Sequence, residues 1–231
     1  MIQRSVQCLF AGLLLAFGVG CAGTCPSLTQ PGKGVRTILL VRHGAYVEDE
    51  ELEARKVLTP QGRKQAQLTG KRLAELPIKL DEVITSPVQR SRETAQIACR
   101  EFGRVQPVVD EELAECGPPQ TGEASAPNPA TEMELVCREH LDHVYGRYFR
   151  PTPDRDTAVV LFCHGNVIRY LWCKALGVDP GVWPRLKVSN CHVTEIRVQA
   201  DGTVVPVSYN DVGHLPPACR TFSWRRQMYQ P

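Results

Sequence analysis

The chain has 231 residues, of which 42% are hydrophobic and 23% charged, so it is long enough for one folded domain with appendages. Its 27 basic and 25 acidic residues leave a net charge of only +2. General binding of nucleic acid needs a basic face, and this near-balance argues against it. We therefore expect no nucleic-acid partner.

The first 23 residues are apolar and stand apart from the rest. After Arg4 no charge occurs until Lys33, and residues 8–21 are strongly apolar. This run is shorter than the roughly 20 residues that span a bilayer, and it fits the apolar region of a secretory signal. Its ending resembles a bacterial lipoprotein signal, in which Cys21 would be lipidated. A short membrane anchor and a core helix are the alternatives, whereas a mitochondrial transit peptide would be amphipathic and Arg-rich.

These features predict four parts of the chain. Residues 1–23 are expected to be a signal peptide or membrane anchor, and the Gly-, Pro- and Ser/Thr-rich residues 24–35 a linker. Residues 36–217 are the expected folded domain, and 218–231 a C-terminal tail. The expected location is membrane-associated or exported: a cell-envelope lipoprotein in a bacterium, or an organelle membrane such as the mitochondrial one in a eukaryote.

Apolar runs and capping signals alternate along the expected domain. Strands are predicted at 36–41, 82–85, 105–109 and 157–163, with a hairpin of 187–198 and 203–209. Helices are predicted at 59–76, 86–102, 131–148 and 166–176, with a loop over 114–130. Thr59 before Pro60, and Thr131 with Glu134 three residues later, are helix N-cap signals. Strands alternating with helices predict an α/β fold with a parallel-rich central sheet and helices on both faces.

Two predicted strands end in the dipeptide His-Gly. Arg42 and His43 follow the run 37–41, and His164 follows the run 159–163. Ligands of open α/β sheets bind at the carboxyl ends of strands, so the two imidazoles are expected to meet there. The glycine after each histidine allows backbone N–H groups to approach an anion.

The chain resembles the histidine phosphatase superfamily, which has the phosphoglycerate mutase-like fold, over about residues 36–217. The motifs that carry the resemblance follow in the family's order at 40–44, 58–62, 85–95 and 163–169. Within that superfamily the chain is most similar to the mitochondrial serine/threonine-protein phosphatase branch. Tyr46, Trp183 and residues 211–213 are among the markers of that likeness.

The resemblance implies a metal-independent phosphatase without a cofactor. His43 would be the nucleophile and form a phosphohistidine, because imidazole is neutral and nucleophilic near pH 7. Arg42 and Arg90 would hold phosphoryl oxygens, which their planar guanidinium groups match. His164, protonated beside the phosphate, would add a charge-assisted hydrogen bond. Glu115 would be the acid–base residue.

The assignments of the acid and of the second arginine have rivals. A carboxyl group near phosphate should have a raised pKa, which helps it to protonate the leaving oxygen and then to activate water. Glu115 lies where family members place this acid, and Glu111 and Glu112 are close rivals. Arg92 is the rival of Arg90, and only the spacing of the motif separates them.

Other polar residues and the cysteines have plainer interpretations. Arg169 is expected to be a structural or substrate-rim residue on a helix face. Cys137, His140 and His143 share a helical face, but no fourth ligand is evident, so no metal is expected there. Three of the ten cysteines are expected to be buried free thiols, namely Cys99, Cys163 and Cys173. Export would permit a disulfide within the set Cys25, Cys116, Cys137, Cys191 and Cys219, whose pairing stays open.

The resemblance implies phosphoserine and phosphothreonine in proteins as substrates, and a small phosphate ester is the alternative. A phosphoglycerate mutase usually continues the first motif with Glu-Ser, whereas residues 45–47 are Ala-Tyr-Val. A catalytically inactive phosphate-binding module would lack one of the core residues. The branch carries an N-terminal aromatic multimerisation motif that is not evident before residue 36, so the oligomeric state stays open.

Overall fold

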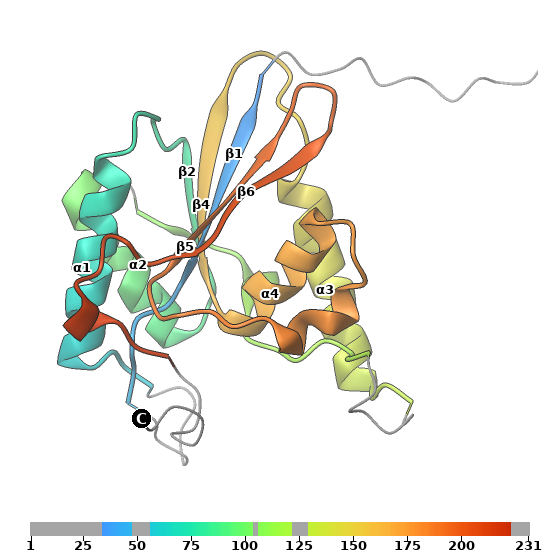
Figure 1. Ribbon diagram of the computed structural model, residues 1–231, viewed down its shortest axis with the longest axis horizontal. Coiled ribbons are helices and arrows are strands. Elements are labelled where there is room, and N and C mark those ends of the chain that lie inside the picture. The colour runs from blue at the N-terminus through green and yellow to red at the C-terminus, as the bar shows by residue number, and fades with distance from the viewer. Residues whose placement is uncertain (1–33, 48–55, 104–105, 122–128, 223–231) are drawn as a thin grey trace, which may run out of the picture. The chain divides into compact units, whose positions relative to one another are not determined.

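The computed structural model describes residues 34–47, 56–103, 106–121 and 129–222 (Figure 1). All described residues belong to one compact unit, Pro31–Pro231. The predicted signal or anchor, nearly all of the predicted linker and the last residues of the predicted tail lie outside the described residues. Within the described ranges, no helix has both the length and the apolarity needed to cross a membrane.

The described residues form one six-stranded sheet with the order β3-β2-β4-β1-β5-β6. The strands are β1 (Arg36–Arg42), β2 (Glu82–Thr85), β3 (Val108–Val109), β4 (Thr157–Cys163), β5 (Val193–Val198) and β6 (Val204–Asp211). The first four run parallel to one another, β5 pairs antiparallel with β1, and β6 pairs antiparallel with β5. This arrangement confirms the predicted α/β fold with a parallel-rich sheet.

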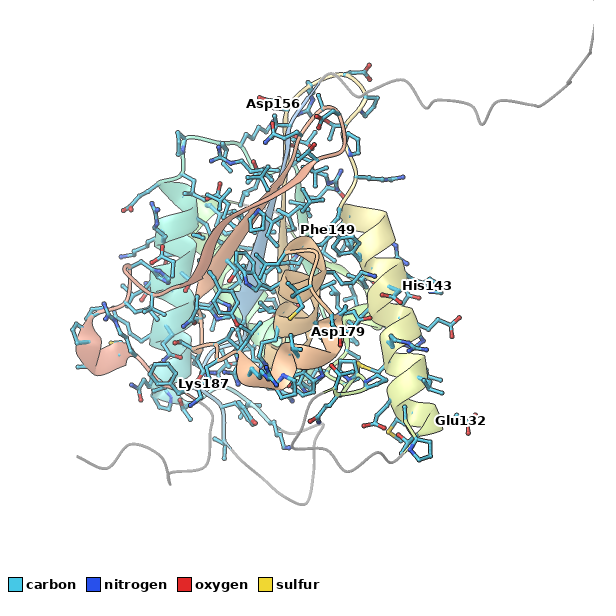
Figure 2. All side chains as sticks on the ribbon, turned by 45° about the vertical axis from the view of Figure 1, so that its right-hand side comes forward. Glu132, His143, Phe149, Asp156, Asp179 and Lys187 are labelled. Atoms are coloured by element: carbon cyan, nitrogen blue, oxygen red, sulfur yellow. A yellow bond between two sulfur atoms is a disulfide. The ribbon has the colours of Figure 1, made fainter. Side chains whose placement is uncertain are left out.

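Helices pack on both faces of the sheet, because its central strands are apolar on both sides. The helices are α1 (Pro60–Ala74), α2 (Gln89–Phe102), α3 (Glu132–Tyr148) and α4 (Gly165–Ala175), and Figure 2 labels Glu132 and His143 on α3. Successive side chains of a strand point to opposite faces. Leu39 and Val41 of β1 belong to a core cluster with side chains of α1 and α2, whereas Ile38 and Leu40 join side chains of α3 and α4. Figure 1 shows the two helix pairs on opposite sides of the strands.

Both predicted helix caps are present. The Thr59 side chain accepts a hydrogen bond from the Gly62 N–H at 3.0 Å. Thr131 and Glu134 form a complete capping box, in which each side chain accepts a bond from the backbone N–H of the other. Such caps stabilise a helix by about 1 kcal/mol each, because they pair N–H groups that the helix leaves unpaired.

Several element boundaries differ from the sequence prediction: β3 is limited to Val108–Val109, α1 ends at Ala74, β6 extends to Asp211, and two elements begin later than predicted. Helix α2 begins at Gln89 rather than at 86, because the Ser86 N–H still pairs with Phe162 O at 2.9 Å and keeps the chain extended beside β4. Strand β5 begins at Val193 rather than at 187, because the preceding chain bends: Cys191 has a φ of +52°.

The structure also decides the cysteine pairing among the described residues. Cys116 and Cys137 form a disulfide, which joins the loop after β3 to helix α3. The three cysteines expected to be buried thiols are buried and unpaired, and so is Cys191. Cys219 is also unpaired but partly exposed. Cys25 lies outside the described residues.

Candidate active site

His43 and His164 lie side by side because the strands that precede them are neighbours in register. The last residues of β1 and β4, Arg42 and Cys163, are paired in the parallel ladder. The ladder continues one step further, since the His43 N–H donates to Cys163 O at 3.0 Å. The two ring centroids are 5.3 Å apart, and both side chains are buried. The two imidazoles therefore meet at the carboxyl edge of the sheet, where the His-Gly pattern predicts them.

The surroundings of His43 set its tautomer and its charge. Nδ1 lies 2.9 Å from Gly44 O, and a carbonyl can only accept, so Nδ1 carries the ring proton. Nε2 keeps its lone pair and accepts a bond from Arg90 Nε at 3.2 Å. Burial, followed by the charges of Arg42, His164 and Arg90, holds the pKa of His43 well below its ordinary value. The ring is therefore neutral, and its unprotonated nitrogen faces a cation.

Side chains from distant parts of the chain fix the backbone around His43. Gly44 N–H donates to Thr94 Oγ1 at 3.0 Å, Ala45 N–H to Gln65 Oε1 at 2.8 Å, and Asn190 Nδ2 to His43 O at 3.1 Å. A Cβ at Gly44 would lie 2.6 Å from Gly62 O, so this position needs glycine for the close approach of α1. Sequence reasoning missed Asn190, because it lies in a segment that was expected to be a regular strand.

Two buried arginines face the histidines. Arg42 ends β1 and donates to Val188 O at 2.6 Å. Arg90 lies in the first turn of α2 and is 3% exposed, whereas Arg92 is exposed. Burial lowers the pKa of Arg42, and the negative charge of Glu115 opposes this effect. The fold thus brings Arg42 and Arg90 to the histidines and leaves the rival arginine at the surface.

His164 forms the opposite wall of the site. Its Nε2 lies 2.7 Å from Ser86 Oγ, and its Nδ1 lies 3.4 Å from Glu115 Oε2. Burial and the charges of Arg90 and Arg42 hold the pKa of His164 well below its ordinary value. The protein groups alone therefore favour the neutral ring. The protonated form expected from the sequence requires the negative charge of a phosphate to overcome these effects.

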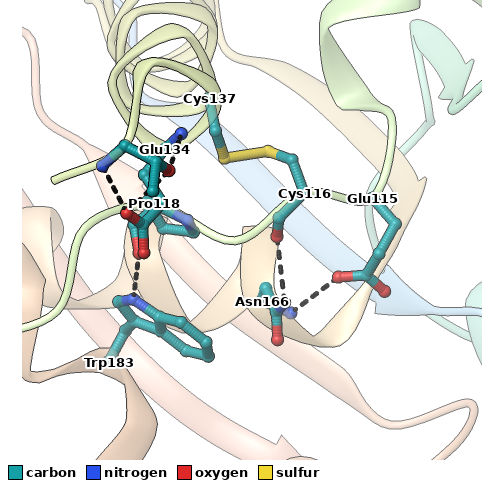
Figure 3. The surroundings of a disulfide bond; sticks show 8 residues. Glu115, Cys116, Pro118, Glu134, Cys137, Asn166 and Trp183 are labelled. Atoms are coloured by element: carbon teal, nitrogen blue, oxygen red, sulfur yellow. Dashed lines mark hydrogen bonds between the residues drawn. A yellow bond between two sulfur atoms is a disulfide. The ribbon is translucent and has the colours of Figure 1, made fainter.

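Glu115 completes the cluster from a segment without helix or strand, just after the short 3₁₀ turn Glu111–Leu113. Its Oε1 accepts the Asn166 N–H at 3.4 Å (Figure 3). Its Oε2 lies 3.7 Å from Arg90 Nη2. The side chain keeps 29% of its surface exposed. Burial of the carboxyl group raises its pKa, against the opposing charges of Arg42 and Arg90. A raised pKa suits a group that must carry a proton to a leaving oxygen.

The two rival glutamates lie elsewhere. Glu111 is exposed to solvent. Glu112 binds Arg147 Nη2 at 2.5 Å and His143 Nδ1 at 3.1 Å, which directs its carboxylate to α3. Of the three candidates, the structure therefore brings Glu115 to the histidines.

The cluster is built for an anion. One ring nitrogen of each of His43 and His164 and one carboxylate oxygen of Glu115 lie within 4.8 Å of one another, a spacing that could in principle hold a metal ion. However, Arg42 and Arg90 face the same space and would repel a cation. His164 is also the N-cap of α4, so the positive end of that helix dipole favours negative charge here.

Two further sequence candidates have structural roles. Arg169 is 7% exposed, donates to Gly165 O at 3.1 Å and lies 4.5 Å over the Trp183 ring, so it supports α4. Cys137, which shares a face of α3 with His140 and His143, is in a disulfide and therefore has no thiolate to bind a metal.

Comparisons with known proteins agree with this geometry. A model of the "Histidine phosphatase superfamily (branch 1)" matches residues 38–135 and 121–211. The mitochondrial serine/threonine-protein phosphatase Pgam5 of Caenorhabditis elegans is 36% identical over 187 residues, which are 79% of this chain and 65% of that protein. PGAM5 of Homo sapiens is 33% identical over 189 residues, 80% of this chain and 65% of that protein. The chain thus spans just under two thirds of the length of these relatives.

Solved structures give the same fold. A phosphoglycerate mutase from Plasmodium falciparum matches with 29% identity and a TM-score of 0.56, covering 80% of this chain and 96% of that one. A mutant phosphoserine phosphatase from Entamoeba histolytica matches with 19% identity and a TM-score of 0.59, covering 78% of this chain and 100% of that one. The chain belongs to the histidine phosphatase superfamily and has its phosphoglycerate mutase-like fold.

Proposed function

We propose that this member of the histidine phosphatase superfamily is a metal-independent phosphomonoesterase that works through a phosphohistidine on His43. The observation that carries the proposal is the neutral His43 ring, whose Nε2 lone pair faces Arg90 while Nδ1 is held by Gly44 O. A nucleophile in this state is ready for an electrophile bound among cations. Phosphoryl transfer depends on a positioned nucleophile and on cationic groups that stabilise the phosphoryl oxygens.

In the first step, the phosphoryl oxygens bind to Arg42, Arg90 and the N-terminus of α4. Nε2 of His43 attacks phosphorus, and the bond from phosphorus to the leaving oxygen breaks. Glu115 supplies a proton to that oxygen. The Nδ1–H bond to Gly44 O supports the positive charge that develops on the phosphorylated ring.

In the second step, water attacks the phosphohistidine. The Glu115 carboxylate accepts a proton from the water, the bond between nitrogen and phosphorus breaks, and inorganic phosphate leaves. His164 assists as a donor. Ser86 Oγ accepts the Val88 N–H at 3.2 Å, so its own proton can bond to Nε2 of His164. The ring proton is then on Nδ1, which faces Glu115 and the phosphoryl oxygens.

Phosphoserine and phosphothreonine in proteins are the proposed substrates. The support is that the relatives with 33–36% identity are named serine/threonine-protein phosphatases. A small phosphate ester is the alternative, and phosphoglycerate mutase activity or phosphate binding without catalysis are the remaining ones. Attachment to a membrane or export through residues 1–23 stays a prediction. The Cys116–Cys137 disulfide supports export, since disulfides persist mainly in oxidising compartments.

The test is to trap the intermediate on the full-length chain. With EDTA present, wild type incubated with a radiolabelled phosphoserine peptide and quenched in alkali should carry alkali-stable phosphate and release inorganic phosphate. His43→Ala should do neither, whereas His140→Ala, at an exposed position of α3, should do both. Loss of activity in EDTA would contradict the metal-independent mechanism.

A panel of phosphopeptides and phosphorylated metabolites decides the substrate class. A preference for one metabolite of more than about tenfold in kcat/KM, which equals about 1.4 kcal/mol, would overturn the protein substrate. Interconversion of phosphoglycerates faster than their hydrolysis would indicate a mutase. Phosphopeptide binding with equally negligible turnover in wild type and His43→Ala would indicate a binding module.

A further inference from the structure

Glu115 lies in an irregular segment that is tied to helix α3 on both sides. On its N-terminal side, Asp110 accepts bonds from Arg147 Nη1 at 2.6 Å and from Tyr148 Oη at 2.8 Å. On its C-terminal side, the next residue along the chain is Cys116, which is bonded to Cys137 of α3. Residues 114–121 form no helix or strand, so backbone ladders do not fix the position of Glu115.

The contacts of the Glu115 carboxylate are long, between 3.4 and 3.7 Å, so its position depends on the backbone that carries it. Cys116 connects this backbone to the site in a second way. Its carbonyl accepts a bond from Asn166 Nδ2 at 2.9 Å, and the Asn166 N–H binds Glu115 (Figure 3). The disulfide thus anchors Cys116, which follows the proposed acid Glu115 in the chain and binds Asn166 through its carbonyl.

Trp183 adds one bond further along, from its Nε1 to Pro118 O at 3.1 Å. Figure 3 draws this bond as a dashed line. Of the ties named here, the disulfide is the one that a reductant can break. Cys116 is partly exposed and is followed by the exposed Gly117, whereas Cys137 is 3% exposed, so a thiol can approach from the side of Cys116.

We propose that the Cys116–Cys137 disulfide is a redox-sensitive positioning device for Glu115, so that a dithiol reductant lowers acid–base catalysis while the histidines and arginines stay in place. This inference rests on the proposed phosphatase function. One thiolate of the dithiol attacks a sulfur of the pair, forms a mixed disulfide and releases the other cysteine as a thiolate. The second thiol then displaces the bound cysteine and closes the reductant's own disulfide. The dithiol loses two electrons, and the two cysteines take up two protons.

The effect of the reductant should depend on the leaving group. A phosphoserine peptide leaves as a poor alkoxide and needs a proton from Glu115, whereas p-nitrophenyl phosphate leaves as a stable phenolate and needs little help. General acid–base catalysis contributes roughly 10²–10⁴-fold, and small misplacements lose much of it. We expect reduction of the full-length chain by dithiothreitol to lower kcat on the phosphopeptide roughly tenfold and on p-nitrophenyl phosphate less than about twofold.

Variants show whether the effect passes through Glu115. The double variant Cys116→Ser/Cys137→Ser should match reduced wild type and should not respond to dithiothreitol. Cys219→Ser, which removes a partly exposed free thiol, should respond as wild type does. Glu115→Gln should show the same residual rate when oxidised and when reduced. An equal loss on both substrates, an undiminished response in Glu115→Gln, or no response in wild type would overturn the proposal.

Hydrogen–deuterium exchange gives a readout that does not need activity. Reduction should speed exchange at the amides of residues 111–121, while the amides of β1 and β4 keep their protection. Unchanged exchange at 111–121, or loss of protection in β1 and β4 as well, would also overturn the proposal. If oxidised wild type releases no phosphate, the proposed function fails, and the exchange data alone then decide whether the disulfide holds this segment.

Discussion

The two halves of the site are held by different kinds of structure. His43 and His164 follow adjacent parallel strands, whose register runs without interruption from Arg36↔Thr157 to Arg42↔Cys163. Glu115, by contrast, lies in an irregular segment held by side-chain bonds and one disulfide. Backbone ladders bring the two histidines together, and side-chain bonds then fix the segment around His43, whereas the position of the acid depends on a few bonds of about 1 kcal/mol each and one covalent link.

Burial also acts on the two halves with opposite effects on pKa. It lowers the pKa of His43 and His164 and raises that of Glu115, because in each case the charged form is disfavoured. All three groups are thereby driven towards neutrality, and the arginines supply the positive charge that attracts a phosphate. Burial thus favours the unprotonated nucleophile and the protonated acid, which are the forms that the first step uses.

The largest expected effect comes from removing Arg90, the cation that contacts His43 in the half held by the sheet. Arg90→Ala should lower kcat/KM for p-nitrophenyl phosphate about 10³-fold or more, as arginines that stabilise phosphoryl transfer do. Arg90 Nε also contacts the nucleophilic nitrogen of His43 at 3.2 Å, so both positioning and charge are lost. Steady-state kinetics on full-length protein measure the effect.

Arg92→Ala is the matched control, because Arg92 lies two residues away on the same helix and is exposed. It should leave kcat/KM within about twofold of wild type, as surface substitutions usually do. Comparable losses in the two variants would contradict the assignment of Arg90 as a phosphate clamp.

The half held by the sheet was the half that the sequence could predict. Apolar runs that end in His-Gly imply strands with histidines at their carboxyl ends, and the motif spacing selected Arg90 over Arg92. The structure brings the two histidines together because both follow neighbouring parallel strands, whose carboxyl ends meet at one edge of the sheet. The helix caps at Thr59 and Thr131 are likewise local, and both were predicted.

The other half depends on contacts between distant residues, which a single sequence does not reveal. Three glutamates lie within five residues of one another, and their spacing does not show which of them faces the site. The bonds of Glu112 to His143 and Arg147 of α3 direct that side chain away from the site. The cysteine pairing was open for the same reason. Asn190 belongs to the half held by the sheet, where it binds the His43 carbonyl. It was missed because the composition of its segment predicts a strand, whereas the chain bends there.

A smaller and more selective effect is expected in the irregular half. Glu115→Gln should lower kcat on a phosphoserine peptide roughly 10²-fold, and on p-nitrophenyl phosphate much less, because only the alkyl ester needs a strong proton donor. Glu111→Gln is the matched control at an exposed position of the same segment. In wild type, kcat/KM on the peptide should fall as the pH rises through the raised pKa of Glu115, since the first step uses its protonated form. A variant with the same loss on both substrates would show that Glu115 does not act as the acid.

The smallest expected effect concerns stability and separates the two halves by its sign. The unfolded chain binds a proton at His164 near the ordinary pKa of 6.5, whereas burial and the two arginines keep the native ring neutral well below it. Native stability is therefore lost as the pH falls below 6.5. Between about pH 7 and pH 5.5, the free energy of unfolding of His164→Asn should fall by about 1 kcal/mol less than that of wild type, because the variant lacks one group whose protonation is linked to unfolding. Urea unfolding at the two pH values measures this, with His140→Asn at an exposed position of α3 as the control.

Glu115 acts in the opposite direction, because its raised pKa makes the native state hold a proton that the unfolded chain releases as the pH rises above 4.5. Glu115→Gln should therefore lose less native stability than wild type as the pH rises above 4.5. An identical pH dependence of stability in both variants and wild type would contradict the contrast between the two halves.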